Sequence, residues 1–153
     1  MMKKFLILVG IIVLSVSMLS ACGKERSKTY EGDVDGKHVI TTLTYKKNKV
    51  LKQNTISTLK YNDLGMSKEE GKKVFDDNRS LKDYKGVSYK LEDNHEKWVE
   101  TVEIDYKKAD LKEIGKQLPY ATLSKNGKKV NMEGSVRYLK HLGFKQKSNM
   151  TDD

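Results

Sequence analysis

Apolar and polar side chains alternate through two neighbouring stretches in the second half of the chain. Alternation with a period of two is typical of a β-strand that buries one face. A polar turn over residues 93–96 separates the stretches, so together they predict a β-hairpin. Residues such as Glu103 and Asp105 are expected on a solvated face, which predicts an antiparallel sheet covered on one side. The apolar positions are Val87, Tyr89, Leu91, Trp98, Val102, Ile104 and Tyr106.

The first half of the chain predicts three further strands, over residues 29–33, 38–46 and 50–61. Asp35-Gly36 lies between the first two, and this dipeptide tolerates the positive φ angles of a tight hairpin turn. Residues 46–49 are polar and predict the second turn. Val39 and Leu43 are expected on the buried face, with Thr42 and Thr44 on the other.

Helix starts are predicted at three places. Ser67 and Glu70 have the spacing of a capping box, which begins a helix that should end near Asn78. Asp110 should begin a short helix that Pro119 ends, and Asn131 a last helix that ends at Gly143. Residues 120–123 and 128–130 should pair between these two helices. The expected fold is α+β, an antiparallel sheet with two or three helices mainly on one face. A single domain should span residues 29–145, followed by a polar tail, 146–153.

A weak internal repeat suggests that the fold is a duplicated ββα unit. Shifting the sequence by about 44 residues places Leu43 to Lys46 on Val87 to Lys90 and residues 68–74 on 112–118. With one further residue of shift, Leu59 falls on Ile104. A true duplication predicts that the two units superpose, with their helices on the same face of the sheet. Chance matching in a chain rich in Lys and Glu is the competing interpretation.

The N-terminus predicts export and a lipid anchor. Lys3 and Lys4 precede an uncharged run over residues 5–19, which is short for a permanent membrane span. Leu19-Ser20-Ala21-Cys22 resembles the bacterial lipobox, whose cysteine is acylated after cleavage. The signal peptide should be residues 1–21 and the lipidated tether 22–28. As the only cysteine, Cys22 has no disulfide partner within the chain, and no neighbour that would activate a free thiol.

Composition narrows the class of partner. The formal net charge is +9. Cleavage of the signal peptide should remove Lys3 and Lys4, and the mature chain stays basic. The expected location is the extracytoplasmic face of the cell membrane. Membrane lipid reached through acylated Cys22 is then one partner, and anionic lipid, a wall polymer or another protein are further candidates. A basic surface that serves only solubility is the alternative. Nucleic acid is not expected, because Arg26, Arg79 and Arg137 are scattered.

The sequence predicts neither a cofactor nor a metal site nor a catalytic centre. His38, His95 and His141 are far apart, whereas zinc needs three or four converging ligands. Glu100 is the anomaly, because it interrupts an apolar face. It should either pair with a lysine at a sheet edge or line a pocket, and in a pocket it could serve glycan hydrolysis. Tyr89, Trp98 and Tyr106 share the strands with Glu100, so these four residues are the candidate ligand site. Aromatic residues that simply form the core are the alternative.

Several segments together resemble the YehR-like bacterial lipoproteins, a family of unknown function. These segments are Leu43–Lys46, Val50–Gln53, Tyr61–Gly65, Asp105–Leu111 and Leu142–Lys145. The resemblance covers most of the chain that follows the signal, and it implies an α+β domain behind a lipidated cysteine. It transfers no catalytic residue. The functional hypotheses are a non-enzymatic binding domain, an accessory protein of envelope assembly, and a glycan-active enzyme that uses Glu100.

Overall fold

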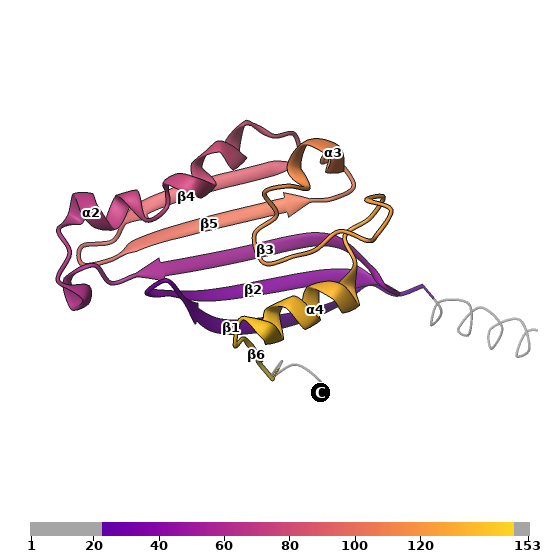
Figure 1. The fold of residues 1–153 in the computed structure, drawn as a ribbon, viewed down its shortest axis with the longest axis horizontal. Coiled ribbons are helices and arrows are strands. Elements are labelled where there is room, and N and C mark those ends of the chain that lie inside the picture. Colours follow the sequence, from indigo (N-terminus) through magenta and orange to yellow (C-terminus); the bar gives the residue numbers. More distant parts are fainter. Residues whose placement is uncertain (1–22, 149–153) are drawn as a thin grey trace, which may run out of the picture.

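The computed structural model describes residues 23–148, so the signal peptide, Cys22 and the end of the tail lie outside the described residues. One antiparallel sheet has the strand order β4-β5-β3-β2-β1-β6 (Figure 1). No helix within the described range is long and apolar enough to cross a membrane. The strands are β1 (Arg26–Val34), β2 (Lys37–Lys46), β3 (Lys49–Leu59), β4 (Val87–Asp93), β5 (Trp98–Asp105) and β6 (Lys145–Gln146).

Tight turns join the first three strands, as the sequence predicts. Asp35 and Gly36 have φ angles of 52° and 77°, and Lys47 has a φ of 54°. Positive φ at both central residues, as at Asp35 and Gly36, gives a two-residue turn the twist that its flanking strands need. β1, β2 and β3 therefore form a local meander. β1 pairs with β2 from Arg26↔Tyr45 to Val34↔Lys37, and the pairing of β2 with β3 shifts its register once, between Thr44 and Tyr45.

Helical segments cover one face of the sheet (Figure 1). They are η1 (Asn62–Leu64), α2 (Lys68–Lys73), η2 (Asp76–Asp83), α3 (Leu111–Ile114) and α4 (Met132–His141). The capping box of Ser67 and Glu70 is confirmed, and Asn131 caps α4 through Gly134 N. The predicted end of α2 near Asn78 is wrong. Phe75 N donates to Lys72 O, three residues back rather than the four of an α-helix. The Phe75 side chain is 1% exposed and packs into the core.

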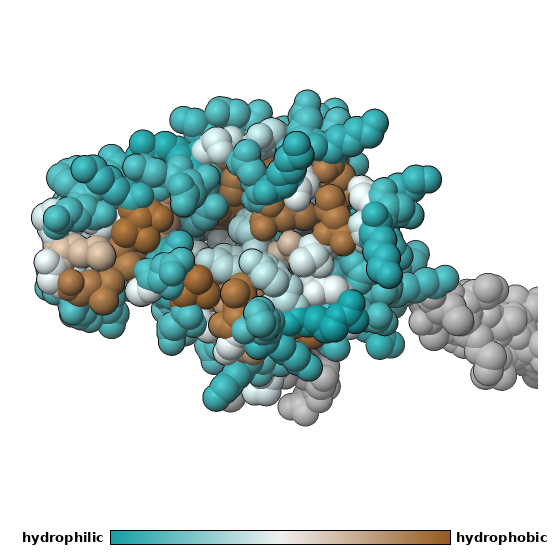
Figure 2. Space-filling model, in the orientation of Figure 1, coloured by the Kyte–Doolittle hydropathy of each residue, from teal (hydrophilic) through white to brown (hydrophobic). Residues whose placement is uncertain are grey.

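The face beneath the helices holds two apolar clusters. The smaller one consists of Leu59, Tyr61, Phe75 and Trp98, close to the β4–β5 turn. The larger one occupies the rest of this inner face and includes Tyr30, Leu43, Val102, Ile104, Ile114 and Leu139. The predicted division into one buried and one solvated face is therefore confirmed. Figure 2 shows apolar side chains of this side inside a hydrophilic rim.

The residue-by-residue repeat is wrong, although the two units share an outline. β2–β3 and β4–β5 are both hairpins, and each is followed by a helix on the same face of the sheet (Figure 1). The proposed shift equates Leu43 with Val87 and, with one further residue, Leu59 with Ile104. Val87 does pair with Ile104, but Leu43 pairs with Gln53 and not with Leu59. The second hairpin therefore has a different register, which the sequence match does not reproduce.

The last strand changes the expected end of the domain. Lys145 and Gln146 form β6, which pairs with Glu31 and Tyr30 of β1. Lys147 N also donates to Thr29 O at 2.9 Å. Residues 145–147 are therefore part of the sheet edge, and the polar tail begins later than its predicted start at residue 146.

Candidate functional site

Glu100 is buried inside the protein rather than placed at an edge. β5 is the second strand of the sheet, and the side chain is 1% exposed. Asn78 Nδ2 donates to Oε1 at 3.0 Å, and Tyr89 OH donates to Oε2 at 3.1 Å. Both carboxylate oxygens thus have partners within the fold, and these are an amide and a phenol rather than the lysine that the sequence suggested.

Burial dominates the electrostatics around this carboxylate. It raises the pKa of Glu100, and the hydrogen bonds from Asn78 and Tyr89, with the charge of Lys37, offset part of the increase. Burial and the neighbouring Glu100 together raise the pKa of Tyr89. Ser57 lies opposite Glu100 on β3, and its buried Oγ has no hydrogen-bond partner among residues 23–148. A buried polar group without a partner is uncommon.

We expect Glu100→Gln to stabilise the protein at pH 7–8 relative to the native chain. The raised pKa means that the folded state binds a proton more readily than the unfolded state. Glu100 therefore lowers stability above its folded pKa, and this cost disappears as the pH falls toward the unfolded value of about 4.5. Urea unfolding from pH 4.5 to 8 should show the advantage of the variant shrinking with falling pH.

Glu103→Gln is the matched control, because it removes the same charge from the exposed face of the same strand. Subtracting its profile corrects for the change in net charge. A Glu100→Gln advantage that is constant with pH, or that grows toward acid, would contradict the effect of burial.

The other predicted ligand residues do not join Glu100 in one groove. Trp98 lies in the smaller cluster, 6% exposed, and its Nε1 donates to Lys68 O at 2.9 Å. Tyr106 lies at the opposite end of the sheet, where its OH donates to Gln53 Oε1 at 2.5 Å. Of the three aromatic residues predicted to share a site with Glu100, Tyr89 alone contacts it. A ligand role for these residues stays a prediction, and the fold gives each of them a partner in the interior.

Gln53 is the centre of a buried network that sequence reasoning missed. Its Nε2 donates to Pro119 O at 2.6 Å, to Thr55 Oγ1 at 3.0 Å and to Thr41 Oγ1 at 3.2 Å. Thr41 and Thr55 also share a hydrogen bond across β2 and β3, at 2.8 Å. The signal was present in β3, where polar residues occupy the inward positions of an alternating strand. The network fastens the loop at Pro119 to the middle of the sheet.

The face of the sheet opposite the helices carries a polar groove. Its volume is about 590 Å³, and it crosses β2, β3, β5 and β4 at the end of the sheet where β1 begins. No helix covers this outer face (Figure 1). The lining side chains that point outward are hydroxyls, an amide and charges of both signs: Thr42, Thr44, Lys52, Asn54, Ser88, Glu103, Asp105 and Lys108.

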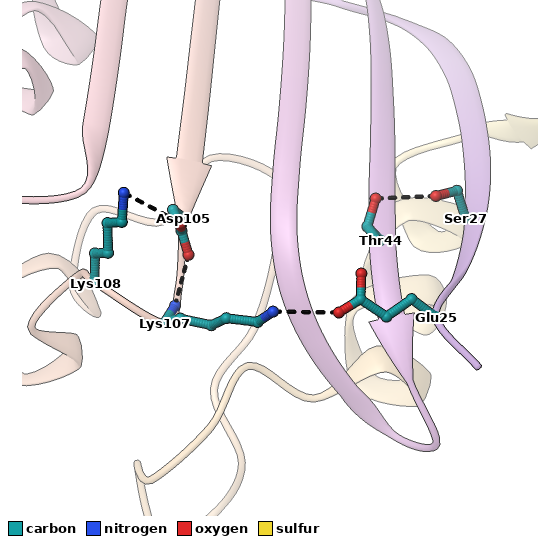
Figure 3. Close-up of polar contacts among 6 residues, drawn as sticks. All are labelled: Glu25, Ser27, Thr44, Asp105, Lys107 and Lys108. Carbon is teal, nitrogen blue, oxygen red and sulfur yellow. Dashed lines mark hydrogen bonds and ion pairs between the residues drawn. The ribbon is translucent and has the colours of Figure 1, made fainter. Parts of the chain in front are cut away.

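Side chains around the groove hold one another in place. Asn54 Nδ2 donates to Glu103 Oε1 at 3.1 Å, so two strands present a fixed amide and carboxylate. Thr44 Oγ1 and Ser27 Oγ lie 2.9 Å apart, and Lys108 Nζ lies 4.0 Å from Asp105 Oδ2 (Figure 3). The sequence placed Thr44, Glu103 and Asp105 on the solvated face, but alternation carries no information about where a sheet surface is hollowed.

Hydrogen bonding is the chemistry that this groove offers. Carboxylates and hydroxyls accept, while the amide and the ammonium groups donate, which suits a ligand rich in hydroxyl groups. No group of three His, Cys, Asp or Glu residues in the described part of the chain could hold a metal ion. Among the histidines, His38 Nδ1 contacts Asp33 Oδ1 at 2.9 Å in an exposed pair.

Comparisons with known proteins agree with the architecture. A family described as a protein of unknown function, DUF1307, matches residues 26–145. The uncharacterized lipoprotein Lin0239 of Listeria innocua is 32% identical over 149 residues, which cover 95% of this chain and 97% of that protein. The uncharacterized lipoprotein YehR of Escherichia coli is 30% identical over 151 residues, which cover 95% of this chain and 99% of the relative.

A solved structure extends the likeness to three dimensions. The NMR structure of Escherichia coli YehR superposes with a TM-score of 0.64 at 25% identity, covering 86% of this chain and 99% of that one. The resemblance to YehR-like lipoproteins read from the sequence is therefore confirmed. The family model matches residues 26–145, and the alignments to relatives named as lipoproteins span nearly the whole length of both chains. The chain therefore belongs to the DUF1307 family of lipoproteins of unknown function.

Proposed function

We propose that this lipoprotein is a non-enzymatic binding domain held at the outer face of the cell membrane, with the polar groove as its ligand surface. The ligand class is a hydroxyl-rich polymer of the envelope, such as a wall glycan. The observation that carries the proposal is the uncovered outer face, where fixed hydrogen-bonding groups line a groove of about 590 Å³. Relatives named as lipoproteins support the anchor.

The surroundings of Glu100 favour binding over glycan hydrolysis. General acid catalysis needs a carboxyl group that reaches a substrate oxygen, with a second carboxylate across the bond. Glu100 is 1% exposed, and Asn78 and Tyr89 occupy its oxygens. Glu103 and Asp105 point to the other face of the sheet, as the alternation of β5 requires.

The surface offers little support for an assembly role through an apolar interface. The exposed large apolar residues of the described chain are Ile56, Leu64 and Tyr138. They lie on β3, η1 and α4, so they are spread over separate elements. Protein-binding surfaces of that kind are usually contiguous patches of several hundred Å².

We expect soluble wall fragments to shift amide NMR signals of the groove when added to the protein without its signal and acyl chains. Asn54→Arg should weaken binding about tenfold, because a long side chain fills the groove and breaks the bond to Glu103. Thr58→Arg is the matched control, since it lies on the same face of β3 at the other end and lines no part of the groove. Shifts confined to the helix-bearing face, or equal losses in both variants, would overturn the proposal.

A further inference from the structure

Basic side chains gather at the end of the sheet where β1 begins. This basic foot, as we define it, consists of Arg26, Lys46, Lys47, Lys49, Lys107 and Lys128, all of them exposed. Strand pairing brings them together from distant parts of the chain. Arg26 lies opposite Tyr45, and Lys46 lies opposite Lys49 across the β2–β3 turn.

Two later segments complete the foot. β5 ends at the same edge, because Asp105 pairs with Lys52, and Lys107 follows directly. The loop that carries Lys128 reaches this end too, since Lys49 forms a bridge with Asn131 and Val50 N donates to Val130 O at 3.0 Å. Figure 2 shows hydrophilic side chains along this end of the molecule, at the right.

Acidic residues gather at the opposite end of the strands. The β1–β2 turn, η1, the start of α2 and the β4–β5 turn all lie there, since Asp33 pairs with His38 and Leu59 pairs with Trp98. Lysines lie at this end as well, with Lys60 beside η1, Lys97 in the β4–β5 turn, Lys68 paired to Asp93 and Lys90 paired to Glu92. The acidic side chains of this end are Asp33, Asp35, Asp63, Glu69, Glu92 and Glu96.

The predicted lipid anchor, Cys22, is close in sequence to the basic foot. Cys22 precedes Arg26 by four residues, which reach at most about 14 Å when extended. Glu25 Oε1 and Lys107 Nζ lie 3.2 Å apart, so the chain before β1 is fastened to the residues after β5 (Figure 3). An acyl chain on Cys22 would therefore place this end of the sheet, and not the acidic end, next to the lipid headgroups.

From this arrangement we infer that the basic foot docks on anionic phospholipid headgroups and stands the sheet upright, with its strands along the membrane normal. Each lysine near an anionic surface adds attraction that salt screens within about 10 Å. The acids at the far end are repelled, so the asymmetry orients the domain as well as holding it. The far end then lies about 35 Å above the foot, because β3 runs for 11 residues. The foot shares no residue with the lining of the groove, although both lie at the same end of the sheet, and the inference needs the anchor but not the proposed ligand.

The test uses the acylated protein in vesicles. Because Cys22 carries the lipid, one introduced cysteine is the only thiol for a fluorophore. Lys125→Cys places the probe in the loop of the foot, and Asn94→Cys places it in the β4–β5 turn. A quencher on the lipid headgroups reports distance. In phosphatidylglycerol vesicles at low salt we expect strong quenching at position 125 and at least fivefold weaker quenching at position 94.

Charge reversal supplies the matched controls. Lys47→Glu with Lys49→Glu should reduce the quenching ratio to its value in phosphatidylcholine vesicles, and 0.5 M NaCl should do the same. Lys60→Glu with Lys97→Glu makes the same change in net charge at the far end and should preserve the ratio. Equal quenching of both probes, a ratio independent of salt, or equal effects of the two double variants would overturn the inference. Preferential release of the foot by soluble poly(glycerol phosphate) would assign it to a wall polymer and overturn it as well.

Discussion

Replacing Gln53 by leucine is expected to lower the free energy of unfolding by about 3 kcal/mol, roughly a hundredfold in the folding equilibrium. Leucine fills a similar volume but leaves the Tyr106 OH and Pro119 O without their partner in the interior. An unsatisfied buried polar group costs about 1–3 kcal/mol. Urea unfolding followed by tryptophan fluorescence measures the loss, since Trp98 is the only tryptophan.

A double-mutant cycle separates the network from simple packing. Tyr106→Phe removes the hydroxyl that donates to Gln53 Oε1 and should cost about 1 kcal/mol. The combined variant should lose less than the sum of the two, because with phenylalanine at position 106 no hydroxyl is left unpaired beside the introduced leucine. Additive losses would show that the 2.5 Å contact contributes no coupling and would contradict the network.

Replacing Cys22 by alanine is expected to abolish anchoring as a lipoprotein. The lipobox interpretation attaches a diacylglyceryl group to the cysteine sulfur, and alanine offers no equivalent atom. The variant should remain an unprocessed or mislocalised precursor that retains residues 1–21. Labelling cells with radioactive palmitate and separating membrane from soluble fractions measures the effect, with loss of label as the main result.

Ser20→Ala is the control for this change, because it keeps a small residue before the cysteine and leaves the acylated atom in place. It should be processed and labelled like the native chain. A Cys22→Ala protein that migrates and fractionates like the native one would contradict the assignment of the lipobox. Cys22 lies outside the described residues, so this prediction depends on the sequence and on relatives that are named lipoproteins.

Local signals in the sequence predicted most of the elements. Alternation located the strands, and Asp35-Gly36 located a turn whose two residues have positive φ. Ser67 and Asn131 located helix starts because a capping side chain is a property of a few neighbouring residues. The end of α2 was missed because tertiary packing of Phe75 decided it. The order of strands likewise depends on which hairpin edge meets β3, and this pairing joins residues far apart in the chain.

The candidate site was predicted only in part. Glu100 was recognisable as an anomaly because it interrupts an apolar face, and its burial gives that anomaly a physical meaning. Its partner Asn78 could not be inferred, because it comes from η2, 22 residues away. The groove could not be predicted from the sequence, because its residues also come from separate strands. Thr44 and Asn54 look like ordinary solvated positions in the sequence, and only the folded sheet brings them to one hollow.

The position of β5 has a consequence for how the protein folds. β1, β2 and β3 are joined by tight turns, so they can assemble as soon as residue 59 has emerged. The free edge of β3 must then wait for β5, whose pairing begins at residue 98. Pairing over such a distance along the chain is slow, and an unpaired edge invites association with other chains. We therefore expect the folding chain to be most exposed to aggregation in the interval between the formation of the two hairpins.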